Sequence, residues 1–230
     1  MLKLMLAVAV VGVSVAERKC AKPSWRAYEG SLGLGLPQIH EQYKPLKERG
    51  RNIIYYDLQD QRIAIVSNIS VNGRHGDFKI ITDYKEGVRY IINEKENTCK
   101  VKEITRSFPE LCIPEKATYL FDVQLGGAAQ GGDTISAKAY FGEFEKLKGK
   151  VGVVMTVTSD RYLPVLSTQY GLGKHKFLMS TLFGNIAEPI PSDEIGVFTV
   201  PSICTSQLYQ DEELHVFLGP VANMLLDEIA

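Results

Sequence analysis

The sequence has few long runs of apolar residues, and the single extended run lies at the start of the chain. Residues 4–13 are apolar, follow Lys3 and lead into the small residues Ser14-Val15-Ala16. This run is well short of the roughly 20 residues that a membrane-spanning helix needs. The pattern is typical of a secretory signal peptide, so we expect residues 1–16 to be removed and residues 17–230 to form a soluble, secreted protein.

An excess of charge of either sign is also missing. The chain has 26 Lys and Arg residues against 27 Asp and Glu residues, a net charge of −1. This balance gives no electrostatic reason to expect nucleic acid or anionic lipid surfaces as partners. With 45% hydrophobic and 23% charged residues, the composition is that of an ordinary globular protein. No linker or repeat divides residues 17–230, which we therefore treat as a single domain.

The usual catalytic sequence patterns are absent. The chain has no Gly-x-Ser-x-Gly elbow, no His-Glu-x-x-His helix, no phosphate-binding loop and no EF-hand spacing. The segment Gly33-Leu34-Gly35-Leu36-Pro37 lacks the third glycine of a dinucleotide fingerprint, and we interpret it as a loop. The four histidines are scattered. We expect no enzymatic activity and no organic cofactor.

Closely spaced cysteines are absent as well. Cys20, Cys99, Cys112 and Cys204 include no Cys-x-x-Cys pair, so a zinc site is not expected. An even number of cysteines in a secreted chain favours two disulfides, and three connectivities are open.

What the sequence does contain is a long series of short segments rich in Ile, Val and Tyr. Ten strands are predicted at residues 51–56, 61–67, 78–83, 88–93, 99–105, 117–125, 134–144, 150–158, 165–170 and 174–183. Such spacing, without helices of crossover length, predicts an all-β antiparallel sandwich, half-barrel or barrel. Alternation in residues 150–158 places Val153 and Met155 on one face, which is either solid core or the wall of a ligand cavity. One helix is predicted at residues 212–229, interrupted at Gly219-Pro220.

Two further features concern modification and metals. Asn68-Ile69-Ser70 is an N-glycosylation sequon. Three acidic clusters could supply oxygen ligands to calcium, although none has a diagnostic spacing: Asp57 with Asp60, Ser192-Asp193-Glu194, and Asp211-Glu212-Glu213.

Several short segments, taken in order, resemble the ependymin family of secreted glycoproteins. These are Cys20-Ala21-Lys22-Pro23-Ser24-Trp25, Tyr28-Glu29-Gly30, Ile54-Tyr55-Tyr56-Asp57, Tyr90-Ile91-Ile92-Asn93, Cys99-Lys100, Phe108-Pro109, Ile113-Pro114, Leu163-Pro164-Val165 and Val197-Phe198-Thr199-Val200-Pro201-Ser202-Ile203-Cys204. Where family members have a cysteine before Pro-Val, this chain has Leu163. The resemblance implies a disulfide between Cys99 and Cys204, which leaves Cys20 to pair with Cys112.

The resemblance also implies a fold and a function. The fold is similar to bacterial lipoprotein carriers, with two curved antiparallel sheets around an apolar cavity and a short C-terminal helix. The function implied is that of a homodimeric glycoprotein that binds a hydrophobic, lipid-like molecule and calcium, with links to the extracellular matrix and to lysosomes. The side chains that we expect to line the cavity are Ile53, Tyr55, Ile63, Ile65, Ile80, Tyr90, Ile92, Tyr119, Phe121, Tyr140, Val153, Met155 and Phe177. The alternative is a calcium-dependent matrix or cell-adhesion glycoprotein with a solid interior.

Overall fold

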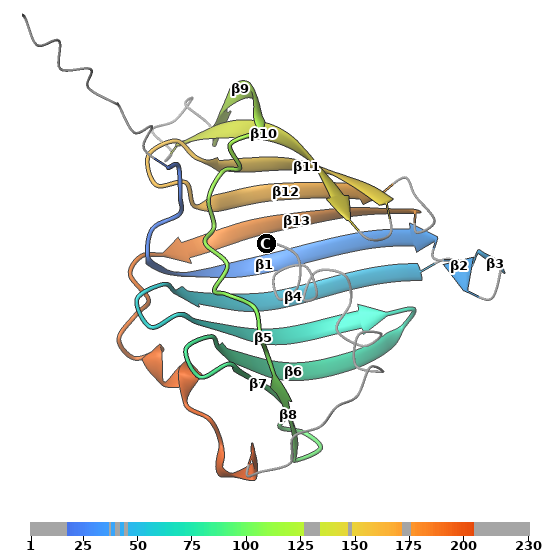
Figure 1. The fold of residues 1–230 in the computed structure, drawn as a ribbon, viewed down its shortest axis with the longest axis vertical. Helices are drawn as coiled ribbons and strands as arrows, with labels where there is room; N and C mark the ends of the chain where they lie inside the picture. The colour runs from blue at the N-terminus through green and yellow to red at the C-terminus, as the bar shows by residue number, and fades with distance from the viewer. Residues whose placement is uncertain are drawn as a thin grey trace, which may run out of the picture.

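The computed structural model describes residues 18–36, 38–39, 42–43, 46–126, 134–146, 149–171 and 176–204. The predicted signal peptide and the predicted helix at residues 212–229 lie outside these ranges. The described chain is all-β apart from two short 3-10 helices, as the spacing of the Ile, Val and Tyr segments predicts (Figure 1).

The strands follow one another along the chain without an α-helix between them among the described residues. Their bounds are β1 Ser24–Leu36, β2 Gln38–Ile39, β3 Gln42–Tyr43, β4 Leu46–Asp57, β5 Arg62–Val71, β6 Arg74–Asp83, β7 Val88–Asn93, β8 Thr98–Glu103, β9 Thr118–Leu125, β10 Ile135–Lys146, β11 Gly149–Thr158, β12 Pro164–Gly171 and β13 Lys176–Ala187. The 3-10 helices are η2 Ile195–Phe198 and η3 Ser202–Cys204. Each of the ten predicted strands corresponds to one of these.

Eleven strands form one antiparallel sheet, in the order β8-β7-β6-β5-β4-β1-β13-β12-β11-β10-β9 (Figure 1). The prediction of two facing sheets is therefore wrong, because these strands form a single sheet. The reason is β1, which pairs with β4 along one edge and with β13 along the other, and so joins the two groups of strands into one sheet. The sheet is not closed, because β8 and β9 lie at its two ends.

The long strand β1 is not among the strands that the sequence pattern predicts. The interpretation of its last part, from Gly33 to Leu36, as a loop is wrong. Gly33 and Gly35 instead pair in register with Met179 and Phe177 of β13.

The sheet has two faces, which we name after one residue of each. The Trp25 face carries Trp25, Ala27, Glu29 and Ser31 of β1, and the residues paired with them on neighbouring strands. The Tyr55 face carries Tyr55 of β4 and the side chains that alternate with the first set.

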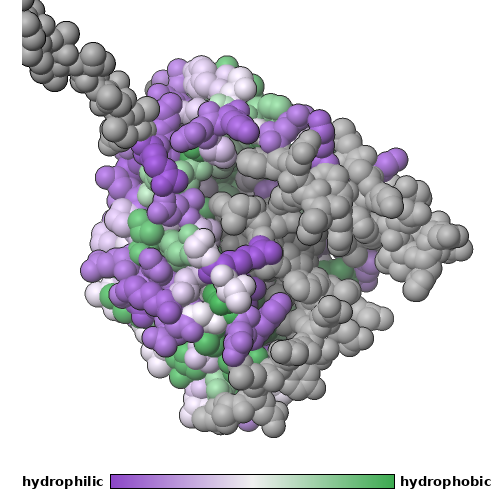
Figure 2. Space-filling model, viewed as in Figure 1, coloured by the Kyte–Doolittle hydropathy of each residue, from purple (hydrophilic) through white to green (hydrophobic). Residues whose placement is uncertain are grey.

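A segment that links β8 to β9, residues 104–117, crosses the Trp25 face and covers a packed core (Figure 1). We call it the crossing segment. The ring of Phe108 lies 5.0 Å from the ring of Tyr56, which in turn stacks on Trp25 at 5.5 Å. The Tyr56 hydroxyl donates a hydrogen bond to the Pro109 carbonyl at 3.1 Å. The described surface around this segment mixes hydrophilic and hydrophobic side chains in the space-filling view (Figure 2).

On the Tyr55 face a second core forms where segment 188–204 packs against β4 to β8. Phe198 lies edge-on to Tyr55 at 6.4 Å, and the Arg62 guanidinium lies 4.5 Å above the Phe198 ring. Arg26 also holds this segment, because its guanidinium contacts both carboxylate oxygens of Glu194 at 3.1 and 3.2 Å.

Both disulfides have the expected pairing, Cys99–Cys204 as the resemblance implies and Cys20–Cys112 by elimination. Cys20–Cys112 joins the start of the described chain to the crossing segment, and Cys99–Cys204 joins β8 to η3. The sequence separations are 92 and 105 residues. Each bond therefore fixes a segment that crosses one face of the sheet, and the cross-link of a long loop restricts the unfolded chain most strongly.

The Arg26–Glu194 pair gives a stability test. We expect Glu194→Gln to lower the free energy of unfolding by about 2 kcal/mol, because it leaves a largely buried guanidinium without its counter-charge. The control is Glu110→Gln, which removes a carboxylate that pairs with Arg18 at 2.7 Å on the exposed surface. That change is expected to cost below about 0.5 kcal/mol. Urea unfolding of both variants measures the difference, and equal losses would contradict the assignment of Glu194 as an anchor.

Candidate functional site

A cluster of polar side chains lies in the middle of the Trp25 face, where β1 and β4 run side by side. Glu29 and Ser31 come from β1, Glu48 and Asn52 from β4, and Ser67 from β5; all five are buried. The register places Glu29, Asn52 and Ser67 in one row across three strands. Buried acidic residues on a sheet face are uncommon, because taking a charge out of water is costly unless it is paired.

Hydrogen bonds fix one side of this cluster. The Ser67 hydroxyl donates to Asn52 Oδ1 at 2.7 Å, and Asn52 Nδ2 donates to Glu29 Oε2 at 3.1 Å. Because Ser67 occupies the oxygen of the amide, the amide nitrogen is directed at Glu29. This chain of donors holds the Glu29 carboxyl in place.

The other side of the cluster has polar atoms without partners. Among the described residues, Glu29 Oε1, Ser31 Oγ and both carboxyl oxygens of Glu48 have no hydrogen-bond partner. Ser31 is paired with Gly50 and Glu48 with Gly33. The Ser31 hydroxyl lies above Gly50, where a Cβ would come within 2.8 Å of Oγ. Because Gly50 has no side chain, there is room for the Ser31 hydroxyl over β4.

Burial changes the ionisation of both carboxyls. It raises the pKa of Glu29 from 4.5 to about 7, against a smaller lowering by the hydrogen bond from Asn52. It likewise raises the pKa of Glu48 to about 7, and the nearby Glu29 raises it further. Both groups therefore titrate near neutral pH, although ordinary glutamates are fully ionised there.

Sequence reasoning missed this cluster entirely. Glu29 and Ser31 lie in the unpredicted strand β1, and Glu48 precedes the predicted start of β4. The available signal was the alternation in residues 24–36, in which every second residue shares a face.

The structure divides the thirteen predicted cavity residues between the two faces. On the Trp25 face lie Ile63, Ile65, Ile80, Tyr119, Tyr140, Val153, Met155 and Phe177, and on the Tyr55 face lie Ile53, Tyr55, Tyr90, Ile92 and Phe121. The two sets cannot line one cavity. The assumed facing is inconsistent between strands, because the register of each hairpin decides which alternate residues share a face.

The eight residues of the Trp25 face differ in what surrounds them. Ile63, Ile65 and Ile80 belong to the packed core beside the crossing segment. Val153, Met155 and Phe177 lie on β11 and β13 and are only partly buried. This second group lies on the same face as Glu29 and Glu48, which we call the acidic pair. It lies on the side of β1 that faces away from β4.

The two predicted acidic clusters within the described ranges are engaged in ion pairs. Asp57 and Asp60 both accept from Arg62, at 2.9 and 2.8 Å, and Glu194 pairs with Arg26. The third cluster, Asp211-Glu212-Glu213, lies outside the described residues. These contacts give the carboxylates a structural role.

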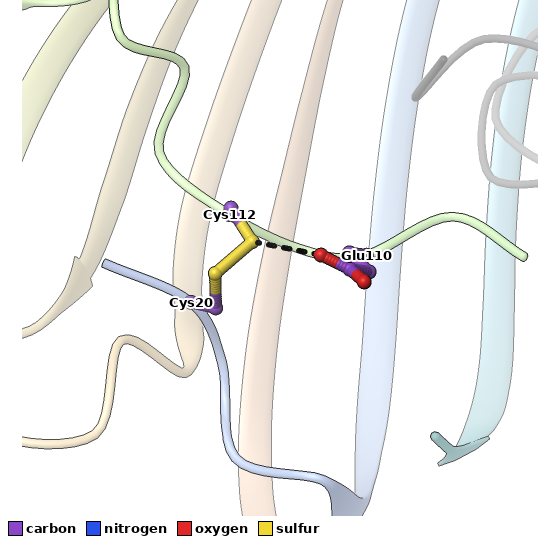
Figure 3. A group of neighbouring side chains, drawn as sticks. All are labelled: Cys20, Glu110 and Cys112. Atoms are coloured by element: carbon purple, nitrogen blue, oxygen red, sulfur yellow. Dashed lines mark hydrogen bonds between the residues drawn. A yellow bond between two sulfur atoms is a disulfide. The ribbon is translucent and has the colours of Figure 1, made fainter. Parts of the chain in front are cut away.

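A further group with potential ligand atoms contains Cys20, Glu110 and Cys112 (Figure 3). A carboxylate oxygen of Glu110 lies 3.8 Å from Cys112 Sγ. The two sulfur atoms are bonded to each other, so neither is a thiolate that could hold a metal. With all four cysteines in disulfides, the chain also has no free thiol nucleophile.

Asn68 of the glycosylation sequon lies on β5, exposed on the Tyr55 face, and its amide donates a hydrogen bond to Asp77. The same face carries a set of exposed apolar side chains on β1, β12 and β13. We call it the leucine patch, and it consists of Tyr28, Leu32, Leu34, Leu166, Leu178 and Leu182.

The acidic pair generates a pH prediction. A carboxyl with a folded-state pKa above its unfolded value stabilises the fold most below about pH 4.5, and this contribution is lost as the pH rises through about 7. We expect the loss to be on the order of 3 kcal/mol per carboxyl. The double variant Glu29→Gln with Glu48→Gln removes this decrease. The control, Glu94→Gln with Glu96→Gln, changes two exposed residues and retains it; urea unfolding between pH 4 and 8 that is parallel for all three proteins would refute the prediction.

Comparison with known proteins identifies relatives of this chain. Ependymin-2 of Carassius auratus is 22% identical over 156 residues, covering 68% of this chain and 69% of its own. Ependymin of Esox lucius is 25% identical over 158 residues, 68% of each chain. Ependymin-related protein 2 of Haliotis asinina is 23% identical over 128 residues, 53% of this chain and 61% of its own.

Among solved structures, an uncharacterized conserved protein from Thermus thermophilus superposes with a TM-score of 0.49 at 11% identity, over 82% of this chain and 91% of that one. A β-barrel-like protein of Brucella abortus superposes with a TM-score of 0.22 at 9% identity, over 74% and 98%. The family model described as Ependymin matches residues 72–204, from the β5–β6 turn to the last described cysteine. Because this match covers more than half of the sequence, the chain belongs to the ependymin family.

Proposed function

We propose that this protein is a secreted binder of a hydrophobic, lipid-like molecule, which lies on the Trp25 face over β11 to β13. The observation that carries the proposal is the set Val153, Met155 and Phe177. These apolar side chains project from β11 and β13 onto one face and are only partly buried. Apolar walls with a few convergent polar groups are typical of small-molecule sites, and the acidic pair supplies such groups beside them.

The position of the crossing segment supports this half of the sheet. Over β4 to β6 the Trp25 face is filled by Phe108 and Leu111, which pack on the core that includes Ile65 and Ile80. A ligand there would have to displace well-packed side chains. A ligand over the partly buried side chains of β11 and β13 would not have to displace such packing.

Secretion is supported by covalent chemistry. Two disulfides that close long loops are typical of proteins from oxidising compartments. The exposed position of Asn68 suits a glycan, which needs access to solvent. No helix among the described residues is long and apolar enough to cross a membrane. Lysosomal delivery and contact with the extracellular matrix stay predictions of the family resemblance.

A pair of neighbouring substitutions tests the ligand site. Val153 and Val154 are adjacent on β11, are both partly buried, and face opposite sides of the sheet. We expect Val153→Gln to weaken binding of an uncharged fluorescent fatty alcohol at least tenfold, because it removes an apolar contact and adds a second amide beside Gln169, its partner on β12. Val154→Gln, on the Tyr55 face, is the control and is expected to leave the affinity within twofold.

Fluorescence titration of the secreted, disulfide-bonded protein measures both affinities, and circular dichroism confirms that each variant is folded. Equal weakening by the two substitutions would place the ligand elsewhere. Absence of binding by the unchanged protein, together with no lipid in an organic extract of the native protein, would refute the proposed function.

We also propose that the protein forms a homodimer through the leucine patch. Leu32 and Leu182 are 58% and 60% exposed, and contiguous exposed apolar side chains of this kind mark interaction surfaces. A two-fold dimer uses the same patch on both copies. The patch shares its face with Asn68, so a glycan there would border the interface.

Charged substitutions in the leucine patch test the proposed dimer. We expect Leu178→Lys with Leu182→Lys to convert a dimer into a monomer, because two ammonium groups on each copy would face each other without water. Leu120→Lys, on the edge strand β9, is the matched exposed control and leaves the dimer intact. Sedimentation velocity distinguishes the two masses, and a dimer that survives the double substitution would move the interface away from this patch.

Calcium binding stays a prediction of the resemblance. Within the described ranges, the acidic clusters that the sequence singled out are paired with Arg62 or Arg26. The alternative function, calcium-dependent adhesion by a protein with a solid interior, therefore gains no support from these clusters.

A further inference from the structure

We propose that Glu29, Ser31 and Glu48 bind the positively charged head group of an amphiphilic amine, whose apolar tail lies over Val153, Met155 and Phe177. We call the three head-group residues the acid cluster. This inference rests on the proposed function, since it assigns the chemical class of the ligand at the same site.

The geometry of the acid cluster is that of a set of unused acceptors. Glu29 Oε1, both oxygens of Glu48 and Ser31 Oγ have no partner among the described residues. Ser31 is only 7% exposed, and its hydroxyl lies over Gly50, between Asn52 and Glu48 on β4. The register places Ser31 and Gly50 between the row of Glu29 and the row of Glu48. A buried polar atom that lacks a partner costs free energy, and a donor supplied by a ligand would recover it.

The charge around the acid cluster selects for a cation. The described side chains that flank it on the same face are Ser67, Ile69 and Val71 of β5 and Met179 and Thr181 of β13, and none is charged. Among the described residues, no cation contributes to the pKa shifts of Glu29 and Glu48. A fatty-acid carboxylate would be repelled by this pair. A desolvated ammonium would be attracted, because Coulomb interactions are stronger away from water.

The number of acceptors also favours an ammonium group over a metal ion. An ammonium has three donors, and the acid cluster offers four unpaired oxygens. Calcium takes six to eight oxygen ligands, which is more than these four. The apolar wall reached across β13 and β12 gives an amine with a tail a second contact that a bare ion lacks.

Binding of such a head group is coupled to protons. At pH 7 the two carboxyls are partly protonated, because burial raises both pKa values to about 7. A bound ammonium favours their ionised form, so association releases protons into the buffer. A purely structural role for the acid cluster would not produce this release.

Three probes of equal chain length separate head group from tail: dodecylamine, dodecanol and dodecanoate, each below its solubility limit and below any micelle-forming concentration. We expect isothermal titration calorimetry at pH 7 to give at least tenfold tighter binding of dodecylamine than of dodecanoate. The heat for dodecylamine should also depend on the ionisation enthalpy of the buffer, which reports proton release.

The variant Glu29→Gln with Glu48→Gln should lose at least tenfold in affinity for dodecylamine, lose the buffer dependence and bind dodecanol as before. The control Glu94→Gln with Glu96→Gln removes the same formal charge from exposed positions and should match the unchanged protein for all three probes. Retained binding of dodecanol also shows that the double variant is folded.

The outcomes distinguish the two proposals. If none of the three probes binds, the proposed function fails. If all three bind with similar affinity, or dodecanoate binds most tightly, the amine assignment fails and the hydrophobic site remains. If the double variant keeps its amine affinity but loses binding of calcium chloride, the acid cluster is a metal site and the inference is overturned.

Discussion

The double pairing of β1 is the constraint on which the rest of the molecule depends. This strand follows the first described cysteine, yet it lies in the middle of the sheet, between β4 and β13. After the short β2–β3 pair, strands β4 to β8 continue from it as a meander, whereas β9 to β13 reach it from the other side only after the crossing segment has spanned the Trp25 face. The β1–β13 pairing joins residues far apart in the sequence and therefore closes a large loop. The two disulfides fix the crossing segment and segment 188–204 to the rest of the chain.

The sequence predicts the strands that have high strand propensity and clear turns at their ends, but it does not predict β1. Segments such as residues 88–93 combine β-branched and aromatic residues with flanking turn formers, and β7 has those bounds. β1 instead contains Gly30, Gly33 and Gly35, which have low strand propensity. A central strand tolerates them because both neighbouring strands supply its hydrogen bonds.

The candidate site shows a different limit of sequence reasoning. Alternation within one strand is local, so it correctly groups Val153 and Met155 on one face. Whether Ile53 joins Ile63 or opposes it depends on the register of the β4–β5 hairpin, in which Ile53 pairs with Val66 and Tyr56 with Ile63. A shift of one residue reverses the facing of a whole strand. The disulfide pairing does not suffer from this limit, because the family resemblance implies Cys99–Cys204 and leaves Cys112 as the partner of Cys20.

The acid cluster is where the needs of folding and of binding separate. A sheet face made only of Ile, Val and Met at these positions would be easier to bury. Taking an ionised carboxyl out of water costs free energy, and burial therefore raises its pKa. Asn52 and Ser67 offset part of that cost for Glu29, and nothing described offsets it for Glu48. An arrangement that gives one carboxyl a single donor and leaves its neighbour unpaired is incomplete as a structural network. A ligand that supplied the missing donors would complete it, so the unpaired oxygens, rather than the apolar side chains around them, determine the ligand chemistry that we propose.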